Sequence, residues 1–250
     1  MSGFDWKYME LFLQSGVLEF LDGVSLHPYR APNQPPETAA ADYKRLRELI
    51  DRCAAESKRE KIPILSGEWG YASHTKGVSL ETQAAFAVRQ QLCNLLNGVP
   101  LSIWYDWKND GHDPADNEQN FGTVKEDLEP KPAYTALKTM TAELSGYRLE
   151  RRLDGLAESD FVLVFVNGAG AVLQPAWHGG AVDQGRQERR QMAPPEVSLP
   201  SAQSAGWGRK IGGQKANVTK NPQFETAKWL ATPSDGRIIA KTTQKTQFAP

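Results

Sequence analysis

Three short apolar runs alternate with helix-like segments over the first 145 residues, and this alternation limits the possible folds most strongly. The runs lie in DGVSLHPY, KIPILSGEWG and VPLSIWYDW, at residues 22–29, 61–70 and 99–107. Helical patterns follow each of them, at residues 37–56, 78–98 and 132–145. Strands that alternate with helices favour a parallel sheet with helices packed against it. The sequence therefore predicts an α/β fold.

The helical segments carry ordinary start and stop signals. In residues 37–56 apolar side chains recur every three or four positions, which is typical of an amphipathic helix. Ser79 is the expected N-cap of the next helix, and Gly98 is its expected stop. Residues 4–21 also have helical spacing, with a break near Gly16.

Polar and aromatic residues stand where each predicted strand ends. In a parallel barrel all such ends lie on one face, where the following loops build the site. A doubly wound sheet also binds ligands at strand ends, but no glycine-rich phosphate loop follows any strand here. Nucleotide binding therefore has little support. The residues at the three ends are His27 and Tyr29, Glu68 and Trp69, and Trp104 and Asp106.

The character of the chain changes after Gly146. Residues 159–177 contain two apolar runs around Asn167-Gly168, a pattern that predicts a β-hairpin. Residues beyond 178 are rich in Gly, Pro, Gln and Ser and lack periodicity, which favours a disordered tail. We divide the chain into residues 1–153, the α/β part; residues 154–178, the hairpin and start of a β-sandwich-like appendage; and residues 179–250, the tail.

The bulk composition excludes several function classes. The formal net charge of −1 gives no general attraction to nucleic acid or to an anionic membrane. No apolar run approaches the roughly 18 residues that a membrane span needs, and no signal peptide is visible in this chain. Cys53 and Cys93 fall in helical segments, where buried free thiols are expected, with a disulfide or metal pair as the alternative. The four histidines have no metal-ligand spacing, so no metal or cofactor is expected.

The strand-end motifs together resemble a known family. DGVSLHPY, ILSGEWGY and LSIWYDWKNDG, followed by FGTV and PKPAYTAL, are similar to the C-terminal half of retaining glycoside hydrolases of the large (β/α)8-barrel clan. The similarity covers residues 1–153 and is nearest to family 39 and the family 5 cellulase-like proteins. It implies a partial (β/α)8 TIM barrel made of strands six to eight with their helices. It also implies an oligo- or polysaccharide substrate.

The resemblance gives each strand-end residue a role. Glu68 takes the place of the catalytic nucleophile. The residues implied to bind the sugar are His27, Tyr29, Trp69, Trp104, Asp106, Trp107 and Asp110. These residue types suit the chemistry, because indoles stack on the apolar faces of sugars while carboxylates, amides and imidazoles bind the hydroxyls. A tyrosine or histidine that donates to a carboxylate also favours the ionised form that must attack.

The chain departs from the family at the second catalytic carboxylate. In the family a Glu after an Asn ends strand four, but the only Asn-Glu here, Asn117-Glu118, lies in a polar loop. The acid/base partner of Glu68 is therefore expected outside this chain. Since three strands cannot close a barrel, we expect marginal stability or self-association through open edges. A catalytically dead carbohydrate-binding remnant and a truncated gene product remain alternatives, and neither the sugar nor the compartment follows from the sequence.

Overall fold

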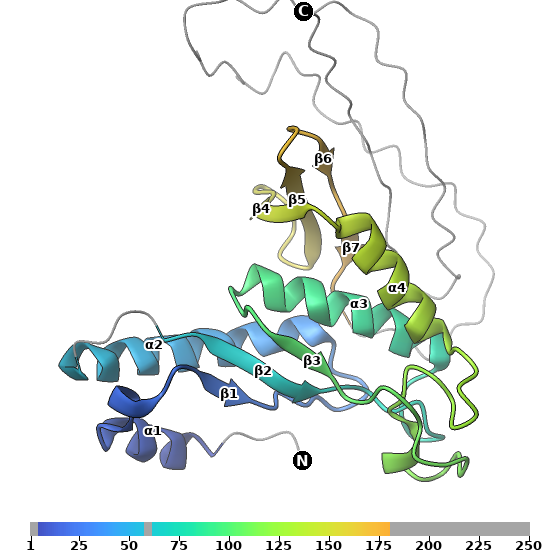
Figure 1. The fold of residues 1–250 in the computed structure, drawn as a ribbon, viewed down its shortest axis with the longest axis horizontal. Helices are drawn as coiled ribbons and strands as arrows, with labels where there is room; N and C mark the ends of the chain where they lie inside the picture. Colours follow the sequence, from blue (N-terminus) through green and yellow to red (C-terminus); the bar gives the residue numbers. More distant parts are fainter. Residues whose placement is uncertain (1–4, 58–61, 181–250) are drawn as a thin grey trace, which may run out of the picture.

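Two separate β-sheets organise the chain in the computed structural model, which describes residues 5–57 and 62–180 (Figure 1). The first sheet contains β1 (Val24–Leu26), β2 (Ile64–Trp69) and β3 (Ser102–Trp104). Its strands run parallel in the order β1-β2-β3. The predicted parallel α/β arrangement is thus confirmed for these strands, while their membership of a partial barrel stays a prediction.

The helices begin and end close to the predicted positions. The N-terminal segment breaks at Gly16, whose φ of 84° is left-handed and suits a residue without Cβ. The hydroxyl of Ser79 accepts a hydrogen bond from the Thr82 amide at 3.1 Å, as expected of an N-cap. The elements are α1 (Trp6–Gln14), η1 (Val17–Phe20), η2 (Pro36–Thr38), α2 (Ala39–Ser57), α3 (Leu80–Leu96), η3 (Glu118–Asn120) and α4 (Pro132–Leu144).

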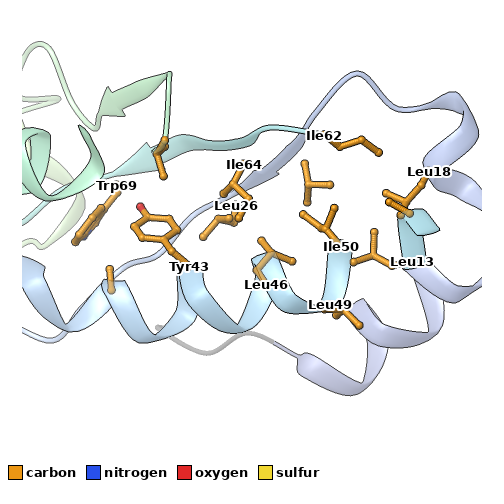
Figure 2. Packing of buried hydrophobic residues seen from close by; sticks show 14 of the residues in the cluster. Leu13, Leu18, Leu26, Tyr43, Leu46, Leu49, Ile50, Ile62, Ile64 and Trp69 are labelled. Carbon is orange, nitrogen blue, oxygen red and sulfur yellow. The ribbon is translucent and has the colours of Figure 1, made fainter. Parts of the chain in front are cut away.

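One face of the parallel sheet packs on α2 and α1 (Figure 2). Leu26 and Ile64 point from the strands toward Tyr43 and Ile50 of α2, and all four are at most 4% exposed. Each such aliphatic side chain contributes about 1.5–3 kcal/mol by leaving water. This face holds the main core and fixes the positions of the strand ends.

The opposite face of the sheet is open in the described part of the chain. Ser25 is exposed, and Ile103 is 47% exposed. Gly67 lies on the same side, because a Cβ there would sit 2.2 Å from the Ser25 hydroxyl oxygen. The site residues described below lie at the end of this open face.

The second sheet contains β4 (Tyr147–Arg152), β5 (Asp160–Asn167), β6 (Val172–Leu173) and β7 (Ala176–His178). All its pairings are antiparallel, and β5 pairs with the other three strands. The simple hairpin expected at residues 159–177 is therefore incomplete. Its returning strand is divided into β6 and β7 near Pro175, which has no N–H to donate to the ladder. In addition, β4, which lies before residue 153, pairs with β5.

A buried ion pair connects the second sheet to the first part of the chain. Arg89 of α3 is 2% exposed and donates from Nε and Nη2 to the two carboxylate oxygens of Glu37, each at 2.7 Å. The indole Nε1 of Trp177 in β7 donates to the same carboxylate at 2.6 Å. This network joins η2, α3 and β7.

The remaining sequence expectations concern the two cysteines, membrane spans and the C-terminal tail. Cys93 is buried and Cys53 is half-buried, and both are free thiols. Within residues 5–57 and 62–180, no helix is long and apolar enough to cross a membrane. The disordered tail predicted for residues 179–250 lies outside the described residues except for its first two positions.

Candidate active site

A bulge near the end of β2 exposes Glu68 on the open face of the sheet. Ser66 pairs with Ser102 and Trp69 pairs with Trp104, so β2 advances three residues where β3 advances two. Strict alternation from the buried Ser66 would turn Glu68 toward the helices. The extra residue instead places Gly67 and Glu68 in succession on the open side, as β-bulges near active sites commonly do.

Two side chains from the end of β1 meet the Glu68 carboxylate. The Tyr29 hydroxyl donates to Glu68 Oε1 at 2.7 Å, and His27 Nδ1 lies 3.8 Å from the same oxygen. Burial raises the pKa of Tyr29 well above its ordinary value, and the hydrogen bond to Glu68 and its negative charge raise this pKa further. Tyr29 therefore remains a hydrogen-bond donor throughout the pH range in which proteins work.

The end of β3 lies directly beside the end of β2. The Tyr105 amide donates to the Trp69 carbonyl at 3.0 Å, and a Cβ on Gly70 would lie 1.7 Å from the Tyr105 carbonyl oxygen. Only glycine fits this approach. The half-buried Trp104 packs on Tyr71 with ring centroids 6.5 Å apart, and its Nε1 donates to the Phe121 carbonyl at 3.3 Å.

The loop after β3 carries the remaining predicted sugar-binding residues. The carboxylates of Asp106 and Asp110 act electrostatically on Tyr105, since after burial they are among the charges that raise its pKa. The peptide bond between Tyr105 and Asp106 is cis. Trp107 is 58% exposed and packs on Tyr134 of α4, with ring centroids 6.0 Å apart.

Trp69 occupies a different place from the one expected. Its side chain is 0% exposed and belongs to the core between the sheet and the helices (Figure 2). Position 69 follows the bulge and returns to the helix-facing side, so the indole presents no surface on which a sugar could stack. This corrects the sequence expectation for Trp69. The structure brings His27, Tyr29 and Glu68 together, with Asp106 and Asp110 near Tyr105.

Buried polar residues support the loop, and the sequence analysis did not single them out. Lys131 is 3% exposed, and its Nζ donates to Asn109 Oδ1 and to the Asn120 carbonyl, both at 3.2 Å. Burial lowers the pKa of Lys131 to about 8. Gln83 of α3 is also fully buried and donates to the Tyr71 carbonyl at 2.8 Å. A lysine in a polar stretch of sequence is normally expected to be exposed to solvent. No local signal therefore predicted that Lys131 is buried and supports the loop.

The described residues contain no set of three or more His, Cys, Asp or Glu side chains placed to hold a metal ion. His112, which follows β3, instead pairs with Glu126 at 2.8 Å. The titratable groups that the structure places at the site are carboxylates, phenols and an imidazole.

The chain is similar to solved structures of glycoside hydrolases. No family model matches the chain, and no curated protein matches it. A family 39 glycoside hydrolase of known structure from the gut symbiont Bacteroides cellulosilyticus WH2 is 27% identical, with a TM-score of 0.56 over 67% of this chain and 36% of that enzyme. A glucosidase from Croceicoccus marinus is 15% identical, with a TM-score of 0.53 over 69% of this chain and 36% of that enzyme.

These similarities concern the fold. The chain has a glycosidase-like α/β fold, and the two solved structures named above are both glycosidases. The chain spans 36% of the length of each of the two enzymes named above.

Proposed function

We propose that this chain is part of a retaining glycoside hydrolase in which Glu68 is the nucleophile. The observation that carries the proposal is the 2.7 Å hydrogen bond from the Tyr29 hydroxyl to Glu68 at the end of the parallel sheet. A donated hydrogen bond stabilises a carboxylate anion, which is the form that attacks. The 27% identity to a family 39 glycoside hydrolase supports the same assignment.

The proposed reaction has two steps. A Glu68 oxygen bonds to the anomeric carbon, and the bond from that carbon to the leaving oxygen breaks with its electron pair. An acid protonates the leaving oxygen, and the same group then takes a proton from the water that hydrolyses the glycosyl ester. We assign this acid/base role to a carboxylate that lies outside the chain, because the sequence has no Asn-Glu at a strand end.

Covalent trapping tests the nucleophile without requiring the acid. A 2-deoxy-2-fluoroglycosyl fluoride carries a leaving group that departs without protonation, so the glycosyl ester should form on Glu68 even if the acid is absent. We expect intact-protein mass spectrometry to detect one added fluoro sugar on the wild-type chain with a gluco- or xylo-configured reagent, and peptide mapping to locate it at Glu68.

Matched variants complete this test. Glu68→Gln should abolish labelling, whereas Glu129→Gln, which alters an exposed carboxylate paired with Lys125, should not. Equal labelling of the Glu68→Gln chain would refute the assignment. If the wild-type chain remains unlabelled but binds oligosaccharides, it is a non-catalytic carbohydrate-binding protein.

A further inference from the structure

One turn of 3₁₀ helix, η3, directs a further carboxylate toward the site. It spans Glu118–Asn120, and its C-cap Phe121 keeps helical dihedrals of φ −76° and ψ −23°. A 3₁₀ helix has three residues per turn, so side chains three positions apart lie on the same side. Glu118 and Phe121 therefore project from the same side of η3.

Phe121 shows which way this side faces. Its ring is 7% exposed and packs edge-on against Tyr29 and Tyr105, with centroid distances of 6.0 and 5.2 Å. Tyr29 is the residue that donates to Glu68. The side of η3 that bears Glu118 thus faces the same two tyrosines.

The electrostatics of these tyrosines agree with this placement. Burial is the largest cause of the raised pKa of Tyr29 and of Tyr105, and the negative charge of Glu118 raises both pKa values further. Glu118 Oε1 accepts a hydrogen bond from Asn117 at 2.9 Å. In the described part of the chain, neither Glu118 nor Glu68 forms an ion pair with a lysine or an arginine.

We propose that Glu118 is a sugar-binding residue of this site and restricts the substrate to sugars without negative charge. This inference rests on the proposed function and extends it to the class of substrate. An ionised carboxylate accepts strong hydrogen bonds from sugar hydroxyls. It repels the carboxylate of a uronic acid, and no paired lysine or arginine offsets the charges of Glu118 and Glu68 in the described residues.

The test compares two ligands that differ mainly in charge. Isothermal titration calorimetry of the full chain would measure the binding of cellobiose and of its uronic acid counterpart, glucuronyl-β-1,4-glucose. We expect the wild-type chain to prefer cellobiose. Glu118→Gln keeps the size of the side chain and an acceptor oxygen but removes the charge, so the preference should fall about tenfold. Glu129→Gln serves as the control and should keep the wild-type preference.

An unchanged preference in the Glu118→Gln chain would overturn the proposal, as would equal binding of the two ligands or no binding by the wild-type chain. Thermal melting of each variant verifies that the folded state is retained, which is expected because Glu118 is exposed. If the trapping experiment fails while the chain still prefers cellobiose and this preference depends on Glu118, only the nucleophile assignment is refuted. The two proposals can therefore fail separately.

Discussion

Replacing Lys131 with methionine should change how the stability of the protein depends on pH. The Lys131 ammonium lies beneath the loop that carries Asp106 and Asp110, and its hydrogen-bond partners are an amide oxygen of Asn109 and the backbone carbonyl of Asn120. Burial lowers its pKa from the ordinary 10.5 to about 8. Keeping this ammonium charged in the folded state therefore opposes folding.

The size and sign of the effect follow from this difference in pKa. Each pH unit between the folded and unfolded pKa values corresponds to about 1.4 kcal/mol, so burial of the charge costs about 3 kcal/mol. Below about pH 8 both states hold the proton and the full cost applies. Between about pH 8 and 10.5 the unfolded state holds more protons than the folded state, so Lys131 makes stability rise with pH.

Urea unfolding followed by tryptophan fluorescence provides the assay. Between about pH 7 and pH 10, the free energy of unfolding of the wild-type chain should rise by about 2–3 kcal/mol relative to that of Lys131→Met. Other titrating groups cancel in this comparison. Lys138→Met, at an exposed lysine of α4, is the control and should follow the wild-type profile. Parallel profiles for the wild-type and Lys131→Met chains would refute the reasoning.

Three further outcomes are expected. Gly70→Ala should destabilise the chain by about 2–3 kcal/mol in urea unfolding, because its Cβ would overlap a backbone carbonyl, while Gly168→Ala, with no atom within 4 Å, should have little effect; equal stability would contradict the close approach. Arg89→Met should cost about 3–5 kcal/mol in the same assay because it leaves Glu37 buried without its cation, and a wild-type unfolding midpoint would exclude this role. Sedimentation velocity should show self-association of the wild-type chain that Ile103→Lys reduces, since the open sheet face exposes Ile103; a monomeric wild-type chain would oppose this expectation.

The sequence predicted those elements whose signals are local. Apolar residues marked the three parallel strands, because the sheet face that packs on the helices must bury apolar side chains. Ser79 marked the start of α3 because capping depends on neighbouring amides. The family resemblance, and not a local signal, placed Tyr29 beside Glu68 in advance.

The missed features depend on contacts between distant residues. The burial of Trp69 follows from a bulge in the pairing of β2 with β3, and no local pattern specifies that register. Lys131 is buried because residues 109 and 120 fold over it. The placement of Glu118 required the turn geometry of η3 and the contacts of Phe121, so its polar surroundings in the sequence gave no indication of it.

The bulge in β2 also determines how this strand tolerates deletions. Removing Gly67 would leave Ser66, Glu68 and Trp69 in regular alternation, with the carboxylate still on the open face and the indole still in the core. Because β2 advances three residues where β3 advances two, the shortened strand would keep its register but lose the local bend and added twist of the bulge. The Tyr29 hydroxyl donates to Glu68 at 2.7 Å in the bulged strand, so the lost bend would change the direction of the carboxylate toward its donor. A shortened β2 would therefore fold in the same way but lose the alignment of Glu68 with Tyr29.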